Sequence, residues 1–429
     1  MASEDFQSFV IHTPEGWRQG RSESLWIDDQ ARLGLAPHQE LRLPQEAGRA
    51  DAIVFDDLGG VYVFDAERGQ LSRYCLEGTE VRPVLRLDVS SLRPAPIESA
   101  AANDAVRRGS LAVSRSTLYI ADTLYRRVLA FHLPTFRLRY ILGDGMLPYA
   151  DAFPPTSQPV EFGLPTAIAT DPHGHLYVLD QAEKQIYRFN RYGLSIAFFA
   201  QNDACLLQTP IDMAIDREDV IYILDTAQRA ILKFDRNGCA MGRVAAFRHA
   251  CPPIRRPIAL TVDQQGVIYV AERLQPSGSR IHRFDAHGRY LGMSRIPGAC
   301  TQLTTAPDGT VYGLCSSEGY LVRFGGSDRF EARGTYYSRV FDSTLPDCQW
   351  HRLYIDAKMP EKTSLAISFQ ASNTPLSTIE DGDWRSVLSS PQGTSVTQDA
   401  LFDDARGRYL QLKVELYGDE HHTPAIKLA

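Results

Sequence analysis

Acidic residues recur at one place in a repeated phrase of this 429-residue chain, each at the end of a short apolar run. The five positions are Asp65, Asp122, Asp180, Asp225 and Glu272. Carboxylates that meet at one mouth of a ring of repeats could bind a divalent cation and support metal-assisted chemistry. Because an acid recurs in nearly every repeat, whereas an active site is asymmetric, we favour a structural role. In that role each acid pairs with a recurrent basic residue and orients one repeat on its neighbour.

Two pairs of histidines are the other candidates for metal chemistry. His173 and His175 lie two residues apart in a turn, and His421 and His422 are adjacent. Two histidines in one turn could share a metal ion, but the sequence predicts no third ligand. Adjacent residues of a strand point to opposite faces, which argues against joint ligation by His421 and His422. We interpret all four as solvent-exposed turn residues.

The sequence carries no other catalytic signature. It contains no HExxH, GxSxG or CxxC motif and no glycine-rich phosphate loop. Its seven cysteines are odd in number and scattered, which is typical of small buried residues in a reducing compartment rather than of a disulfide framework or a zinc site. We therefore expect no catalytic residue, cofactor or metal.

One phrase, which occurs six times between Val54 and Phe324, positions these residues. It consists of an apolar strand, a turn rich in Asp and Gly, a strand carrying Tyr, an acidic residue, and a strand that ends in a basic and an aromatic residue. The marker tyrosines, at intervals of about 43 to 58 residues, are Tyr62, Tyr119, Tyr177, Tyr222, Tyr269 and Tyr312. This is the period of a four-stranded blade, so the sequence predicts an all-β protein with a six-bladed β-propeller.

The turn between the first two strands begins with Asp in most repeats. An Asp at this position accepts hydrogen bonds from the backbone of its own turn, and a following Gly adopts the positive φ that the turn requires. We therefore interpret these carboxylates as turn builders: Asp56, Asp171, Asp216 and Asp263.

The repeated phrase resembles the NHL-repeat family of propellers over residues 50 to 326, which implies the fold but not an activity. A closed ring needs an outer strand from the opposite end of the chain, so that no sheet edge is left open. Two N-terminal segments could supply this strand, Glu23–Asp28 and Gln39–Leu43.

After the repeats, the chain continues with alternating strands of about eight residues between turn-rich loops. They cover 334–342, 350–357, 364–371 and 409–416. This pattern predicts a small antiparallel β-sandwich after the propeller. We expect an N-terminal arm at 1–22, the propeller at 23–332 and the sandwich at 333–429.

The last quarter of the chain resembles a domain of phage-tail-like proteins that are encoded with contractile injection systems. The resemblance rests on the runs Asp342–Arg352, Thr363–Ser372 and Ala405–Ile426. It implies a component of a particle with sheath, tube and baseplate, present in several copies and in contact with other proteins of that particle.

The net charge and the hydropathy of the chain argue against nucleic acid and membrane as partners. A formal net charge of -7 supplies no large cationic surface, so we expect no nucleic acid partner. The N-terminus lacks the cationic start and apolar core of a signal peptide, and no stretch approaches about 18 apolar residues. We therefore expect no membrane span, and synthesis in the cytoplasm followed by assembly into the particle.

The loop at 144–159 is longer and richer in Pro and aromatic residues than the other links between repeats. Long loops on a rigid ring often carry contacts, so we expect interaction residues at Met146, Tyr149 and Phe153. Trp384 lies in a second polar loop and is the tryptophan that we expect to be most exposed. For Trp384, packing in the core or at a sheet edge is the alternative to ligand contact.

Three functions agree with these observations. We predict a non-enzymatic structural component of a phage-tail-like contractile injection particle, which docks at or near the baseplate or contacts the target. One alternative is a metal-dependent propeller enzyme, because NHL-like and related propellers include lyases and lactonases. The other is a module that binds a surface glycan.

Overall fold

The structure, a computed structural model, confirms the all-β class. Its chain divides into two compact units, one with residues 40–290 and 295–323 and the other with residues 1–39, 291–294 and 324–429. The residues that the structure describes are 17, 20–23, 25–27, 33–35, 38–44, 50–77, 80–92, 109–133, 135–143, 160–199, 207–247, 253–274, 278–296, 298–315, 319–324, 330–376, 383–390, 396–419 and 422–428.

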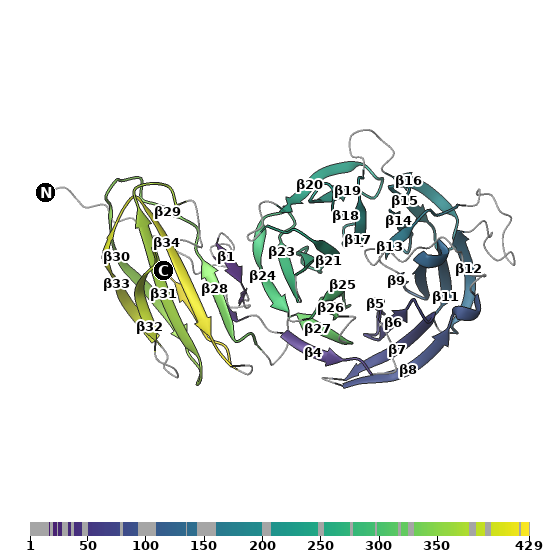
Figure 1. Cartoon of the computed structure of the whole chain (residues 1–429), viewed down its shortest axis with the longest axis horizontal. Coiled ribbons are helices and arrows are strands. Elements are labelled where there is room, and N and C mark those ends of the chain that lie inside the picture. Colours follow the sequence, from purple (N-terminus) through teal and green to yellow (C-terminus); the bar gives the residue numbers. More distant parts are fainter. Residues whose placement is uncertain are drawn as a thin grey trace. The chain divides into compact units, whose positions relative to one another are not determined.

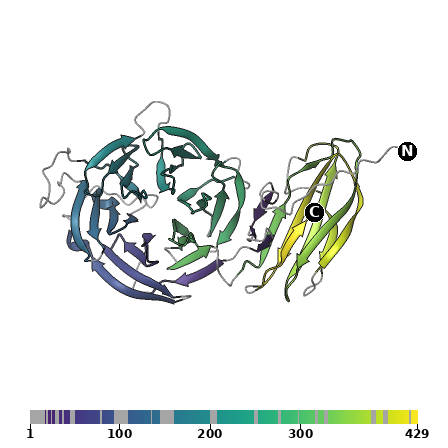
Figure 2. The ribbon, with the colours of Figure 1, turned by 180° about the vertical axis from the view of Figure 1, so that it is seen from behind.

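The first unit is a ring of six antiparallel sheets of four strands, which confirms the predicted six-bladed propeller (Figures 1 and 2). The first strand of each blade lies nearest the centre of the ring. Blades 1 to 3 are formed by β5 (Ala52–Phe55), β6 (Val61–Asp65), β7 (Gln70–Glu77) and β8 (Glu80–Asp88); by β9 (Gly109–Ser114), β10 (Thr117–Asp122), β11 (Arg127–His132) and β12 (Arg137–Gly143); and by β13 (Pro165–Thr170), β14 (Leu176–Asp180), β15 (Gln185–Phe189) and β16 (Ser195–Phe199).

Blades 4 and 5 continue this order along the chain. They are formed by β17 (Pro210–Ile215), β18 (Ile221–Asp225), β19 (Ala230–Phe234) and β20 (Ala240–Ala246), and by β21 (Pro257–Val262), β22 (Ile268–Arg273), β23 (Ser279–Phe284) and β24 (Tyr290–Ile296).

Blade 6 joins the two ends of the ring. Its inner strands are β25 (Cys300–Thr305), β26 (Val311–Cys315) and β27 (Tyr320–Phe324), and its outer strand is the N-terminal β4 (His38–Arg42). The segment Gln39–Leu43 is therefore the closing strand, as one of the two expectations had it. The backbone N–H of Leu43 also donates a hydrogen bond to the carbonyl of Gly319, at 2.9 Å.

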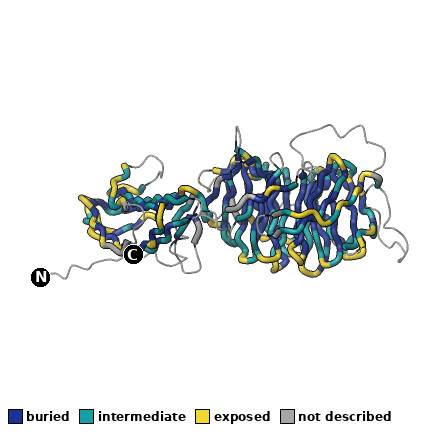
Figure 3. The backbone as a smooth tube through the Cα atoms, turned by 90° about the horizontal axis from the view of Figure 1, so that it is seen from below, coloured by how far each residue is buried: buried dark blue, intermediate teal, exposed yellow. Residues whose placement is uncertain are grey.

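Apolar runs form the second strands because each blade packs against two neighbours. All five residues of β14 are buried, and the same holds for β6 and β18. Between blades 1 and 2, the fully buried Phe64 lies in one apolar cluster with Leu118 and Ile120. Burial of a side chain of this size contributes about 2 to 3 kcal/mol, which favours regular stacking of the blades. Figure 3 shows the buried residues concentrated in the strands.

The second unit is a sandwich of two sheets. One sheet has the order β1 (Arg21–Glu23), β28 (Arg333–Tyr337), β34 (Tyr409–Tyr417), β31 (Ser364–Ser372) and β32 (Arg385–Ser390), with β29 (Phe341–Asp342) beside β34. The other has the order β2 (Leu25–Ile27), β3 (Leu33–Leu35), β35 (Ala425–Leu428), β30 (Gln349–Lys358) and β33 (Val396–Arg406).

The sandwich core is built from alternating residues of both sheets and includes Ile355, Ile367 and Val414, all fully buried. The predicted sandwich strands are present. Segment Glu23–Asp28, the other candidate for ring closure, instead contributes β2, and Leu25 of this strand lies in the sandwich core. Within the described part of the chain, no helix has the length and apolar character to cross a membrane.

Candidate active site

An Asp side chain holds the turn between the first and second strands of a blade. In blade 3, Oδ1 of Asp171 accepts hydrogen bonds from the backbone N–H groups of His173 and His175, at 3.0 and 2.8 Å. The same pair of bonds is made in three other blades, by Asp56, Asp216 and Asp263. These contacts confirm that the turn carboxylates are turn builders.

The second carboxylate oxygen links the turn to the next two strands. Oδ2 of Asp171 accepts a hydrogen bond from the Tyr177 hydroxyl at 3.3 Å, and Nη2 of Arg188 lies 3.6 Å from it. Burial raises the pKa of Tyr177 above its usual range, so its hydroxyl remains a donor. In blade 1, Arg73 binds Oδ2 of Asp56 through Nε and Nη2, at 3.0 and 2.8 Å. We had expected the recurrent base to pair with the acid that ends the second strand. In these blades it pairs with the turn acid instead.

Three of the acids that end the second strands bind backbone N–H groups, whereas Asp122 of blade 2 accepts a hydrogen bond from the side chain of Arg127, at 3.3 Å. Asp180 is fully buried and accepts hydrogen bonds from Gly163 and Leu164, at 2.7 and 2.9 Å, in the link that enters blade 3. Asp225 and Glu272 accept equivalent bonds from the links that enter blades 4 and 5. These three acids therefore have a structural role, but it consists in anchoring each link to its own blade and not in the predicted pairing with the recurrent base.

A divalent metal at the mouth of the channel, as in the lyase or lactonase alternative, would need several convergent ligands. Among the residues that the structure describes, no three His, Cys, Asp or Glu side chains form a group that could hold a metal ion. The described residues therefore do not fit such a metal, and no step below depends on one.

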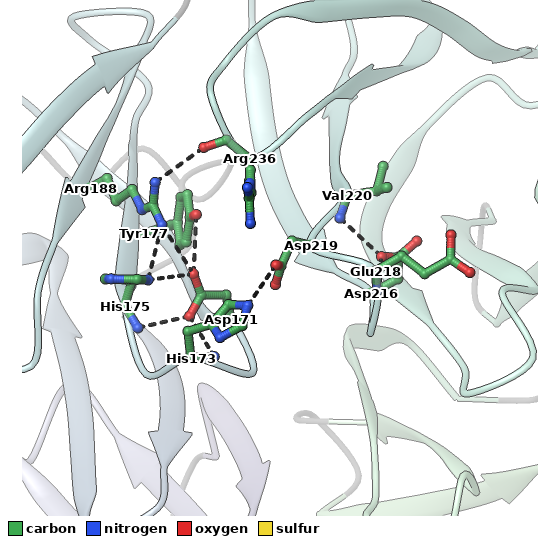
Figure 4. Close-up of polar contacts among 10 residues, drawn as sticks. All are labelled: Asp171, His173, His175, Tyr177, Arg188, Asp216, Glu218, Asp219, Val220 and Arg236. Carbon is green, nitrogen blue, oxygen red and sulfur yellow. Dashed lines mark hydrogen bonds and ion pairs between the residues drawn. The ribbon is translucent and has the colours of Figure 1, made fainter.

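The turn of blade 3 departs from the other Asp turns at one position. His175 stands where the turns of blades 1, 4 and 5 have Gly60, Val220 and Val267, so the turn itself does not require an imidazole. Figure 4 shows His175 beside the carboxylate that builds the turn. Its Nδ1 lies 2.8 Å from Oδ2 of Asp171, a side chain that is only 1% exposed.

The hydrogen-bond partners of His175 favour one tautomer of its ring. Its Nδ1 also lies 3.0 Å from Nη2 of Arg188, but one ring nitrogen either donates to the carboxylate or accepts from the guanidinium. We place the proton on Nδ1 because Arg188 has a second acceptor, the carbonyl of Arg236 at 3.2 Å, and the buried carboxylate needs donors. Nε2 of His175 is then the unprotonated nitrogen, on a side chain that is 28% exposed.

Asp219 brings a second carboxylate to the site from blade 4. Its backbone φ of 62° places it in the left-handed region, where the equivalent turns of other blades have glycines with positive φ: Gly59, Gly174, Gly266 and Gly309. Its Oδ2 lies 2.9 Å from Nε2 of His173 (Figure 4), and its buried Oδ1 has no hydrogen-bond partner among the described residues. A second Asp–His pair thus joins blades 3 and 4.

The two pairs form one acid–base site. The rings of His173 and His175 are 6.4 Å apart between their centres, and each is oriented by a carboxylate. A base and an acid at this separation can remove a proton from one atom of a bound molecule and deliver a proton to another. Side-chain exposure of 59% leaves His173 open to a ligand.

The residues that we selected from the sequence have different outcomes. Met146, Tyr149 and Phe153 lie outside the described residues. Trp384 is half-buried, with its ring 5.7 Å from that of Tyr337, so it takes part in packing within the sandwich. Our interpretation of His173 and His175 as solvent-exposed turn residues was incomplete, because both rings bind carboxylates.

The other two histidines selected from the sequence, His421 and His422, belong to the sandwich unit. His421 lies outside the described residues, and Nδ1 of His422 lies 2.8 Å from Oδ1 of Asp419. Sequence reasoning missed Asp219. The signal that could have revealed it is an Asp at a turn position where four of the other five repeats have Gly.

Comparisons with known proteins support the fold. No family model matches the chain, and no curated protein matches it. Similar solved structures include a virginiamycin B lyase from Staphylococcus aureus, with 14% identity and a TM-score of 0.42 over 65% of this chain and 82% of that one. A putative gluconolactonase has 15% identity and a TM-score of 0.46 over 74% and 97% of the two chains. The calcium-binding protein regucalcin from Agrobacterium tumefaciens has 14% identity and a TM-score of 0.40 over 64% and 89%.

These similarities correct one prediction. At such identities they show the fold alone and say nothing about the substrate of this chain. The similar structures nevertheless include a lyase and a putative lactonase, which contradicts our prediction of a non-enzymatic structural component. We therefore withdraw that prediction.

Proposed function

We propose that the chain is an enzyme that cleaves a carbon–oxygen bond in an ester or lactone by paired acid–base catalysis. The observation that carries the proposal is the contact between His175 and Asp171, 2.8 Å long, in the only blade with a described Asp turn that places histidine at this position. A buried carboxylate that fixes Nδ1–H leaves Nε2 as a base, an arrangement common to many acid–base sites.

In the proposed reaction, Nε2 of His175 takes a proton from a water molecule, whose oxygen attacks the carbonyl carbon. The carbon–oxygen bond then breaks, and its electron pair leaves with the oxygen. His173, protonated on both nitrogens, gives the leaving oxygen the proton of Nδ1 while Nε2–H remains bonded to Asp219. If Nε2 of His175 instead takes a proton from the carbon next to the C–O bond, the C–H electron pair forms a double bond and the reaction is an elimination.

The test is turnover of a panel of chromogenic esters and aliphatic lactones by the full chain, with product masses measured. Hydrolysis adds one water to the product, whereas elimination does not. We expect His175→Ala and Asp171→Asn to lower the rate by about 10² to 10⁴, because each removes the oriented base.

His287→Ala is the matched control. His287 is an exposed turn histidine of blade 5, and its ring has no carboxylate contact among the described residues, so the rate should not change. Absence of turnover by the unmodified chain, or full activity of His175→Ala, would reject the proposal.

A further inference from the structure

A second feature of the ring is a crevice of about 370 Å³ between blades 1 and 2. It opens among the turns that follow the first strands, as the acid–base site does, but one blade away from it. Its apolar walls are Leu58 and Val84 from blade 1 and Leu133 and Phe136 from blade 2. A volume of this size accommodates a small organic molecule.

The apolar walls are unusually exposed for a protein surface. Leu58 is 90% exposed and Val84 is 54% exposed, and both line the same crevice. Leu58 stands at the turn position that holds His173 in blade 3 and Glu218 in blade 4. The turn therefore accepts a polar residue there, and clustered apolar side chains at such a place indicate that a ligand covers them.

Two strained residues line the crevice from blade 2. Arg115 has a φ of 47° and Phe136 a φ of 51°, in the left-handed region that bulky side chains avoid. Such a conformation is strained, and strained residues cluster at active sites and ligand-binding sites. Both turns here direct a functional group to the crevice: a cation from Arg115 and an aromatic ring from Phe136.

Of the four charged residues that line the crevice, two form an ion pair with each other and two have no such partner among the described residues. Arg73 and Asp56 at its base bind each other at 2.8 and 3.0 Å, with the guanidinium 5.6 Å from the centre of the Tyr62 ring. On the rim, Asp57 of blade 1 and Arg115 of blade 2 are exposed, and neither has an ion pair or side-chain hydrogen bond among the described residues. The rim thus offers one free anion and one free cation on either side of an apolar crevice.

We propose that this crevice binds a zwitterionic molecule with an aromatic side chain, an aromatic amino acid or a short peptide that ends in one. The ring packs among Leu58, Val84 and Phe136, the carboxylate pairs with Arg115, and the ammonium group pairs with Asp57. The proposal does not rest on the acid–base function, because it uses none of the residues of that site.

The test is isothermal titration calorimetry of the full chain with three probes of the same ring. L-phenylalanine carries both charges, 3-phenylpropanoate lacks the ammonium group and 2-phenylethylamine lacks the carboxylate. We expect L-phenylalanine to bind at least ~10-fold more tightly than either analogue, because each analogue leaves one rim charge without its partner. Equal affinity for the three probes, or no binding of L-phenylalanine, would overturn the proposal.

Two variants test which residue of the rim binds which charged group of the ligand. Arg115→Ala should weaken L-phenylalanine at least ~10-fold and leave 2-phenylethylamine unchanged, whereas Asp57→Asn should weaken L-phenylalanine and leave 3-phenylpropanoate unchanged. Both side chains are exposed, so folding should be preserved, and the melting temperature checks this. Arg217→Ala, a change at an exposed arginine in the turn of another blade, is the control and should not alter binding. Unchanged affinity in Arg115→Ala would contradict the assigned role of the cation.

Discussion

Asp219 occupies a backbone conformation that L-residues avoid, at a turn position where four other blades have glycine. Left-handed φ costs an Asp about 1 kcal/mol, and the unpaired Oδ1 adds the cost of a buried acceptor. A residue that opposes folding in two ways is expected to have a function that depends on its side chain. The contact with His173 is the only side-chain hydrogen bond that the described structure gives Asp219.

Asp219→Gly should therefore separate stability from activity. Glycine removes both the strain and the unpaired oxygen, so we expect the free energy of unfolding to rise by about 1 kcal/mol. The same change removes the partner of His173, so the proposed ester or lactone cleavage should slow by about 10-fold or more. Urea denaturation and turnover of one preparation measure both quantities. A variant that is less stable than the original chain would show that Asp219 is a structural residue.

At the level of elements, the sequence predicts the strands that belong to the repeats. It does not predict the short N-terminal strands, which are not part of any repeat. The strands of the blades are found because apolar runs, turn residues and marker tyrosines recur together: β14, for example, carries the marker Tyr177 and ends at the recurrent acid Asp180. The strands β1, β2 and β3 have three residues each, too few for a period to appear. Their partners are also remote, as in the pairing of Leu33 with Ile426.

The residues of the candidate site also differ in whether the sequence reveals them. The two histidines of the blade 3 turn are visible in the sequence, but Asp219 belongs to the turn of the next blade. The 2.9 Å distance between its carboxylate and His173 depends on how neighbouring blades pack, which no local pattern states. The departure from Gly at position 219 can be read only once the repeats have been aligned.

Blade 5 contains a buried polar pair between two adjacent strands, β22 and β23. Nε2 of His282 lies 3.0 Å from Oε2 of Glu272, and Nδ1 lies 3.1 Å from the Tyr290 hydroxyl. Burial lowers the pKa of His282, and the hydrogen bond that His282 donates to Glu272 offsets this only in part. Burial also raises the pKa of Glu272, but the hydrogen bonds from His282 and from the backbone N–H of Arg255 outweigh it, so this pKa is lowered. The pair is therefore a neutral imidazole that donates to a carboxylate.

This pair predicts a loss of stability on acidification. Because the pKa of His282 is lower in the folded chain, the unfolded chain binds more protons as the pH falls below about 6.5, and unfolding becomes easier. Glu272 remains ionised in the folded state over this range. In His282→Gln the decrease in the free energy of unfolding between about pH 7 and about pH 5 should be smaller than in the unmodified chain. Urea titrations at the two pH values measure it, and an equal decrease would assign the pH dependence to other groups.

At the scale of the whole ring, the six blades alternate in how their innermost strands are joined. The innermost strands of blades 2, 4 and 6 carry a polar residue at one equivalent position: Ser110, Asp212 and Gln302. Each of these side chains accepts a hydrogen bond from a backbone N–H of the next blade, at 3.2, 2.8 and 2.7 Å. Blades 1, 3 and 5 have alanine at this position: Ala52, Ala167 and Ala259. The ring is thus built as three double blades, each joined to the next by a side chain.

Of the three joints, the one between blades 6 and 1 should contribute most to the stability of the ring. It closes the ring by joining residues that are 249 positions apart in the sequence. Gln302 accepts a hydrogen bond from the N–H of Ile53 and donates one to its carbonyl, at 2.7 and 3.2 Å, and both residues are buried. Gln302→Leu leaves two buried backbone groups without these partners, so we expect a loss of about 2 to 4 kcal/mol in the free energy of unfolding. Ser110→Ala leaves only the N–H of Ile168 without its partner and should cost about 1 to 2 kcal/mol. Urea denaturation compares the two variants, and an equal or smaller loss in Gln302→Leu would show that the closing joint depends on β4 and not on this side chain.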